Sequence, residues 1–270
     1  MSKCPMSWWP FKQKTEPLSV SFLSLLDHLE DIYPIYPSPE LVLPWMAESE
    51  REGADRYRDR SGTRRGGIPA KCSGIVGLHQ RGWIIQSWCD IVITTNGDGH
   101  SFKSHTALPV DVMRSVTQMP PVGEFHAALY GNLPSAPLPA NTLKSIVKIH
   151  LPWTFRMTPG WGLLMLPLEY VKEPRFTSAI GVINPKISPQ LHSILYWHVL
   201  NGQTVIKAGT PLCRVLPINL QDKWTSESRR ATPEEQAFFE AHRLFTSVQY
   251  QRPHGVLGRF YERVQSKLKR

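Results

Sequence analysis

Histidine is the residue type in this chain with the widest range of chemistry, because a neutral imidazole binds metals and moves protons near neutral pH. The sequence has ten histidines. His192 and His198 share a parity that places them on one face of an extended segment. Two such histidines and a carboxylate would suit non-haem iron, and further candidates are His100, His105, His126 and His150. Surface or hydrogen-bonded histidines explain the same pattern more simply, so we expect no metal site.

Asp90 is a candidate for acid or base chemistry, because it follows Trp88 and Cys89 in an apolar segment. Burial there would raise the pKa of its carboxyl. The interpretation that we favour is a polar-face residue at a hairpin. Cys89 or Cys213 would need a neighbouring base to act as a nucleophile, and the sequence locates none. The catalytic candidates are therefore Asp90, His192 and His198.

The aromatic residues are candidates for a binding surface rather than for a catalytic site. Tryptophan and tyrosine rings can stack on sugars or bases, and arginine strengthens such contacts. The candidates for this platform are Trp153, Trp161, Tyr196 and Trp197, with Arg156 and Arg175 nearby. Packing in the core of a β domain is the competing explanation for the same tryptophans.

The net charge of +9 and the pI near 9.5 favour contact with polyanions. Arginines in residues 51–65 and a basic C-terminal helix are possible contacts to nucleic acid or to an acidic protein, although a solvated linker and a solvated helix face are the interpretation that we favour. We find no apolar run of the length that a membrane helix needs, and no signal peptide. The four separated cysteines are typical of reduced, buried thiols. These features predict a cytoplasmic location without a membrane partner, and they do not identify a cofactor.

The N-terminal part is predicted to be an arm. Apolar residues at helical spacing indicate a short helix within 18–32, and prolines from Pro34 to Pro44 forbid its continuation. Residues 48–67 are charged and nearly free of apolar side chains, which favours an exposed linker.

The middle of the chain is predicted to be rich in β-strands. Alternating apolar residues in 83–95, the turn pairs Asn96-Gly97 and Asp98-Gly99, and residues 100–105 predict a hairpin. Further strands are expected in 144–157, 163–166, 179–183, 194–199, 204–207 and 212–218, with turns at Asn201-Gly202 and Ala208-Gly209.

The last part is predicted to be helical. Thr232-Pro233-Glu234-Glu235 has the cap residue, first-turn proline and glutamate of a helix start. Apolar residues repeat every four positions from Val256 to Leu268 among basic ones, which predicts a basic amphipathic helix. The expected organisation is an N-terminal arm with a helix and linker (1–67), a β-rich core (68–222) and a C-terminal helical extension (223–270).

Several stretches together resemble an uncharacterised protein family of marine T4-like tailed phages of cyanobacteria. They are Pro37-Ser38-Pro39-Glu40 with Leu43-Pro44-Trp45, Lys71 to Ile75 with Gly82 to Ile85 and Trp88 to Ile91, Lys148-Ile149 and Pro152-Trp153 with Thr158 to Pro167, and Ile206 to Cys213. The resemblance spans about residues 34–220. It implies a phage origin, with the protein in the host cytoplasm or the virion, and a β-rich domain, but no named activity.

A fainter likeness concerns KAGTPLCRVLPI, which is similar to the closing strands of the dUTPase-like β-clip fold. Asn184 stands where that group has a catalytic aspartate, and an amide cannot act as a carboxylate base. The likeness therefore implies the fold and not the activity.

These observations predict a mainly β protein, with a β-sandwich or β-clip-like core, a short N-terminal helix and C-terminal helices. The expected function is that of a non-enzymatic phage virion, binding or assembly protein that associates with itself or with other virion proteins. The alternative is an enzyme, metal-dependent or not, acting on a small or nucleotide-like substrate.

Overall fold

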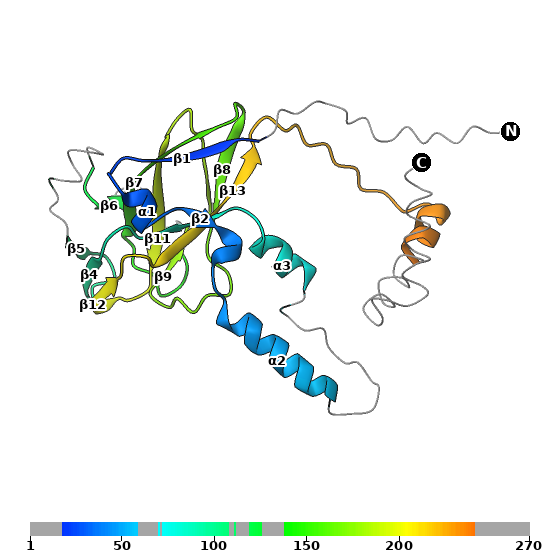
Figure 1. Cartoon of the computed structure of the whole chain (residues 1–270), viewed down its shortest axis with the longest axis horizontal. Coiled ribbons are helices and arrows are strands. Elements are labelled where there is room, and N and C mark those ends of the chain that lie inside the picture. Colours follow the sequence, from blue (N-terminus) through cyan, green and yellow to red (C-terminus); the bar gives the residue numbers. More distant parts are fainter. Residues whose placement is uncertain are drawn as a thin grey trace. The chain divides into compact units, whose positions relative to one another are not determined.

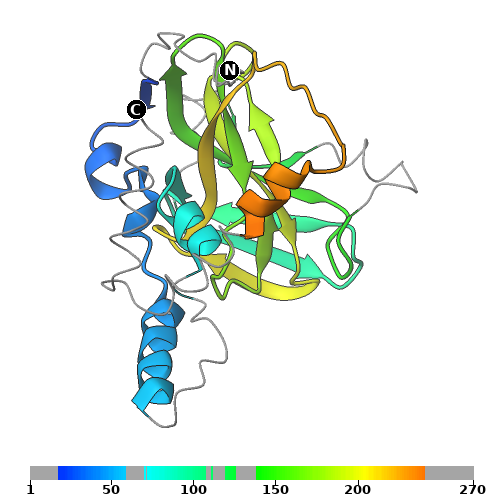
Figure 2. The same cartoon turned by 90° about the vertical axis from the view of Figure 1, so that its right-hand side faces the viewer.

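The fold is that of a computed structural model, which describes residues 18–58, 70, 72–107, 111, 119–125 and 138–240. The chain divides into one unit up to Asp222 and a second from Lys223. Three antiparallel sheets dominate the first unit, which confirms the mainly β fold (Figures 1 and 2). The division after Asp222 coincides with the expected start of the C-terminal extension.

Sheet A has the order β1-β7-β11-β9, with β6 also paired to β7. Its strands are β1 (Val20–Ser24), β6 (Val122–Phe125), β7 (Ile146–Met157), β9 (Phe176–Ser178) and β11 (Gln190–Trp197). The long strand β7 organises this sheet because β1, β6 and β11 all pair with it antiparallel. Along β7 the residues Val147, Ile149 and Leu151 face the core.

Sheet B has the order β10-β8-β13-β3-β2. Its strands are β2 (Tyr36–Pro37), β3 (Trp83–Gln86), β8 (Trp161–Leu166), β10 (Gly181–Ile183) and β13 (Pro211–Asn219). Leu163, Met165 and Val215 on its inner face pack in the same buried cluster as the core residues of sheet A. The two sheets thus share one hydrophobic core, whose burial supplies most of the stability of a domain of this size.

Sheet C contains the predicted hairpin, which is confirmed for residues 91–106, but the single strand expected over 83–95 is wrong, because residues 83–86 form β3 of sheet B. Strand β4 (Ile91–Asn96) pairs with β5 (Phe102–Thr106) and, on its other side, with β12 (Asn201–Ile206). Asp98 accepts hydrogen bonds from the backbone N–H groups of His100 and Ser101, which fixes the turn. Asn201 and Gly202 belong to β12 itself rather than to a turn.

The prediction of a helix over residues 18–32 is wrong in its first half. Residues Val20–Ser24 form β1, and only α1 (Leu29–Ile32) is helical. The reason is tertiary, because the edge of β7 offers backbone partners from Trp153 to Met157 to this segment. Residues of the expected arm therefore belong to both main sheets, since β2 also pairs with β3.

The prediction of an exposed linker from residue 48 is also wrong up to residue 58. Helix α2 (Pro44–Arg58) covers this stretch, after the short 3₁₀ helix η1 (Ser38–Glu40). Pro44 begins the helix, where a missing N–H has no intrahelical partner to lose. Helix α3 (Ser73–His79) precedes β3. The remainder of the expected linker, 59–67, lies outside the described residues.

In the second unit, residues 233–240 are helical. Glu235 N–H donates to Thr232 Oγ1 at 3.3 Å, and Thr232 N–H donates to Glu235 Oε2 at 2.8 Å. This reciprocal pair is the predicted capping box, which is confirmed. The predicted basic helix near the C-terminus lies outside the described residues.

Candidate ligand-binding site

Asp90 is held in an exposed ion pair. Lys207 Nζ donates to its Oδ2 at 2.7 Å, and the backbone N–H of Ala208 donates to its Oδ1 at 2.8 Å. The hydrogen bond from Lys207 is the largest cause that lowers the pKa of this carboxyl. The hypothesis of a buried acid with a raised pKa is therefore wrong, and Asp90 ties the start of β4 to the turn after β12.

His192 pairs directly with His150 across strands β11 and β7. Burial lowers the pKa of both imidazoles to about 4, and the positive charge of Lys148 adds to the effect. The two rings are therefore neutral at pH 7. Among the described residues, no group of three or more His, Cys, Asp or Glu could hold a metal ion.

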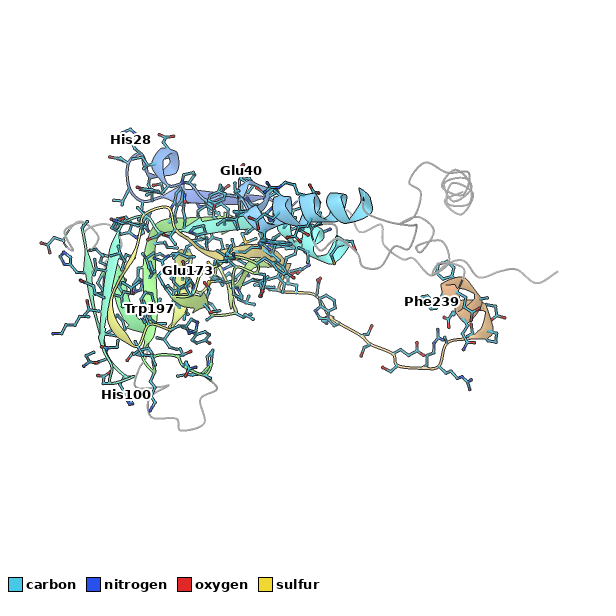
Figure 3. All side chains as sticks on the ribbon, turned by 90° about the horizontal axis from the view of Figure 1, so that it is seen from below. His28, Glu40, His100, Glu173, Trp197 and Phe239 are labelled. Atoms are coloured by element: carbon cyan, nitrogen blue, oxygen red, sulfur yellow. The ribbon has the colours of Figure 1, made fainter. Side chains whose placement is uncertain are left out.

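His198 lies just beyond the end of β11, where its ring nitrogens hydrogen-bond the hydroxyls of Thr142 and Thr177 at 3.3 and 2.8 Å. Six residues of extended chain separate it from His192, or roughly 20 Å. The structure thus does not bring the three catalytic candidates together. Of the other histidines, His28 and His100 lie at the outside of the molecule (Figure 3), and His126 is outside the described residues.

The six platform candidates are also separated. Trp153 and Trp197 are buried in the core, where Trp197 stacks on Phe176 with ring centroids 6.3 Å apart (Figure 3). Tyr196 lies half-buried on the opposite face of sheet A. Core packing is thus the role of these two tryptophans.

Arg175 and the pair Arg156 and Trp161 have different surroundings. Arg175 Nε donates to Glu173 Oε1 at 2.7 Å, and its Nη1 donates to the backbone carbonyl of Val205. Arg156 and Trp161 both line a cavity of about 450 Å³ at the end of β7 and the start of β8. These two of the six candidates therefore share a cavity.

The described cysteines differ in their surroundings. Burial raises the pKa of Cys89 and of Cys213 to about 12. Cys72 is exposed at the start of α3, and the backbone N–H groups of Ile75 and Gly74 lower the pKa of its thiol. Cys89 and Cys213 therefore have the properties of inert core thiols.

The outer face of sheet B carries features that the sequence reasoning missed. Four residues at one register level form a row across its strands, which we call the outer row: Tyr36, Ile84, Arg214 and Leu166. Ile84 is fully buried and packs with Leu41 and Leu43 in a small cluster distinct from the main core. The segment with Leu41 and Leu43 therefore covers part of this face of the sheet.

A cavity of about 440 Å³ lies beside the outer row, and we call it the side pocket. One wall is residues 41–45 with Glu48, and the other is Leu168 with residues 170–173. Trp45 and Tyr170, one from each wall, have ring centroids 5.4 Å apart. Most of the lining is apolar or aromatic, with Glu48, Lys172 and Glu173 as its charged members, and such a lining at this volume is typical of small-molecule sites.

Unpaired buried polar atoms concentrate on the elements around the outer row. Six such side-chain atoms occur in the described part of the chain, and four belong to what we call the donor group: Ser38 Oγ, Trp45 Nε1, His79 Nδ1 and Arg214 Nε. Ser38 is next to β2, its N–H donating to the carbonyl of Gly82 at 2.9 Å, and Trp45 packs on the cluster around Ile84. Because native proteins leave few buried polar groups unpaired, each requires an explanation.

Arg214 is the charged member of the donor group and is only 2% exposed. Burial lowers the pKa of its guanidinium, which stays positively charged. Its charge in turn contributes, after burial, to the lowered pKa of His79. In the sequence, Arg214 is a single arginine between Cys213 and Val215 in an expected strand, and this pattern predicts an ordinary outward-facing position.

No protein-family model matches this chain, and no curated protein is significantly similar to it. No helix of the described residues is long and apolar enough to cross a membrane. The side pocket and the donor group are therefore the features on which a functional conclusion depends.

Proposed function

We propose that this protein acts by binding rather than by catalysis, and that the side pocket holds a small organic ligand. The observation that carries the proposal is the pocket itself, a mainly apolar cavity of about 440 Å³ whose lining includes Trp45, a residue with an unpaired buried donor. Cavities of roughly 300–1,000 Å³ with apolar walls and few polar groups are the usual form of small-molecule sites.

The shape of the pocket supports a ligand with an aromatic or apolar body. Leu41, Leu43 and Leu168 provide aliphatic surface, while Trp45 and Tyr170 provide ring surface. Aromatic walls of this kind contribute apolar contact with little loss of side-chain freedom. The Nε1 of Trp45 has no hydrogen-bond partner among the residues that the structure describes, so a ligand oxygen in this pocket would meet an available donor.

Fluorescence titration with N-phenyl-1-naphthylamine, an uncharged probe, tests this proposal. Val42 lies at the pocket and is 80% exposed, so Val42→Trp should obstruct the cavity without disturbing the core. Ile187→Trp is the matched control, because Ile187 is 82% exposed and does not line this pocket. We expect saturable binding that Val42→Trp weakens at least tenfold and Ile187→Trp leaves unchanged. Equal binding by both variants would contradict the proposal.

A phage virion or assembly role, implied by the family resemblance, is part of the same proposal. Binding a ligand is compatible with self-association or with contacts to other virion proteins. Native mass spectrometry of the full chain would show a discrete oligomer if the protein assembles by itself. A strictly monomeric species over the accessible concentration range would count against self-association and leave binding to the pocket as the function.

An enzymatic role on a small or nucleotide-like substrate is the second candidate, and the pair His150 and His192 favours it. Two neutral imidazoles beside Lys148 could exchange protons with a substrate. His192→Gln tests this role, because any turnover of a candidate substrate should disappear with the imidazole. Binding of the uncharged probe at the side pocket should not change in this variant.

A further inference from the structure

We infer that the cavity shared by Arg156 and Trp161 is a second binding site, for a small ligand that joins an anionic group to an apolar or aromatic body. We call this cavity, of about 450 Å³, the end pocket. Arg156 and Lys186 bind the anionic group, and Trp161 contacts the body of the ligand. The end pocket is independent of the side pocket, because the two linings have no described residue in common.

Three segments of the chain form the walls of the end pocket: residues 155–161, residues 184–186 with Pro189, and residues 220–221. The first runs from the end of β7 to the start of β8, the second lies between β10 and β11, and the third follows β13 (Figure 1). The N–H of Leu220 donates to the carbonyl of Gly160 at 2.8 Å. The N–H of Phe155 donates to the carbonyl of Pro189 at 3.0 Å. Because backbone hydrogen bonds join the walls, the pocket is formed before a ligand binds, as most small-molecule sites are.

The charge of the lining favours an anion. Among the described residues that line the end pocket, Arg156 and Lys186 are the charged ones, and none is a carboxylate. Neither cation forms an ion pair with another described residue. Two positive groups around a cavity without an acid attract anions. Arginine suits the planar array of oxygens of a phosphate or carboxylate, and lysine adds a point charge.

The rest of the lining suits an apolar body. The indole of Trp161 is half-buried, and Met157, Pro185 and Leu220 add aliphatic surface. A tryptophan at such a position offers a large apolar face against which a ring can stack. A cavity of about 450 Å³ is within the range of roughly 300–1,000 Å³ that holds small organic ligands. A ligand with both a charge and an apolar body therefore matches this lining better than a bare inorganic anion does.

The backbone at both cations is held in place by the fold. The N–H of Lys186 donates to Asn184 Oδ1 at 3.0 Å, which fixes the turn after β10. The N–H groups of Ile187 and Ser188 both donate to the carbonyl of Asn184 at 2.9 Å. Arg156 lies within β7, where β1 pairs with it. Binding therefore needs no ordering of the backbone that carries the charges, which lowers its cost in entropy.

Two probes separate the anionic contact from the apolar one. Both 1-naphthyl phosphate and inorganic phosphate carry the anion, but only the first has a ring body. Isothermal titration calorimetry measures the Kd of each probe for the full chain and for its variants. Arg156→Met, Lys186→Met and Lys186→Glu change the cations, and Trp161→Leu removes the ring.

Two control variants exclude other sites. Lys103→Met is the matched control for the loss of a cation, since Lys103 is exposed on β5 and lines neither pocket. Val42→Trp obstructs the side pocket and leaves the end pocket untouched. Circular dichroism of each variant shows that the fold is kept, which we expect for exposed residues such as Arg156 and Lys186.

We expect the wild-type chain to bind 1-naphthyl phosphate at least tenfold more tightly than inorganic phosphate, because burial of about 60 Å² of apolar surface corresponds to about a factor of 10. Trp161→Leu should reduce this preference. Arg156→Met and Lys186→Met should each weaken both probes about threefold, as is usual for exposed ion pairs. Lys186→Glu should weaken them about tenfold, because its carboxylate would repel the anion. Both control variants should bind like the wild-type chain.

Three results would overturn the inference. The first is an absence of binding of 1-naphthyl phosphate to the wild-type chain. The second is a loss of affinity in Lys103→Met as large as in Lys186→Met, which would mean unspecific attraction to a basic protein. The third is binding that Val42→Trp weakens and Arg156→Met does not, which would place the probe in the side pocket. The proposed function has its own test with the uncharged probe, so each can fail without the other.

Discussion

Replacing Arg214 with methionine should stabilise the unliganded protein. The guanidinium is 2% exposed and forms no ion pair with the described residues, so its burial is not offset by a partner. Exchange of buried charged groups for apolar residues of similar volume is often neutral or stabilising, by up to about 4 kcal/mol. Methionine keeps the unbranched aliphatic stem and its packing. We expect a gain of about 1–3 kcal/mol in the free energy of unfolding.

Urea unfolding of the wild-type chain and of Arg214→Met measures this gain. In a unit of 222 residues, each kcal/mol corresponds to about 2–4 °C in Tm. Thermal unfolding therefore provides a second readout, with Arg156→Met, a change at an exposed arginine, expected to change the stability by no more than about 0.5 kcal/mol.

A loss of more than about 2 kcal/mol in Arg214→Met would refute the reasoning. Such a loss would mean that the guanidinium makes favourable contacts within the chain, as in a completed buried ion pair. The sign of the change thus distinguishes a buried charge that lowers the stability of the fold from one that stabilises it.

Three further predictions concern residues away from Arg214. The pKa of His150 and of His192 is lowered to about 4 in the folded protein, below the ~6.5 of an unfolded chain. The free energy of unfolding should therefore be highest above pH 6.5 and should fall by on the order of 2 kcal/mol per histidine between pH 7 and 4. His192→Gln should flatten this decrease in urea titrations at each pH. Maleimide should label Cys72 in the native protein before the two buried thiols, as peptide mass spectrometry would show. Gly82→Ala should destabilise far more than Gly99→Ala in thermal unfolding. Both residues have positive φ, but only at Gly82 would the new Cβ meet a backbone oxygen, at 2.1 Å.

Local sequence signals predicted the features that depend on neighbouring residues. The turn at Asn96 to Gly99 and the capping box at Thr232 are fixed by side chains that bond to backbone within three residues. Alternation predicted strand β4 because one of its faces packs on the core. These features can be predicted from the local sequence, without knowledge of the rest of the fold.

The errors arose where distant segments decide the local structure. Residues 20–24 have apolar positions compatible with either period, and pairing to β7 selects the strand. Pro44 was interpreted as a break although it suits the first turn of a helix, so the polar stretch after it was taken for a linker. The spacing of apolar residues alone decides neither between helix and strand for residues 20–24 nor between helix and linker after Pro44.

The candidate site was out of reach for a related reason. Arg214 has the parity of an outward-facing strand residue, and an arginine at such a position is normally solvated. Its burial results from segments that cover the sheet from elsewhere in the chain, including η1 and the cluster of Leu41 and Leu43. The sequence contains these segments but does not show that they meet over sheet B.

A comparison within the protein separates the site from ordinary imperfect packing. Trp197 Nε1 and Ser193 Oγ are also buried and unpaired, yet both are neutral and belong to residues that face the main core. An unpaired neutral group carries a penalty of about 1–3 kcal/mol that a large core can offset. The guanidinium of Arg214 is charged, lies on the opposite face of sheet B, and neighbours a residue that packs against the walls of the side pocket. Among these unpaired groups Arg214 therefore combines a positive charge with a position outside the main core, and the free energy of its burial is the quantity that Arg214→Met measures.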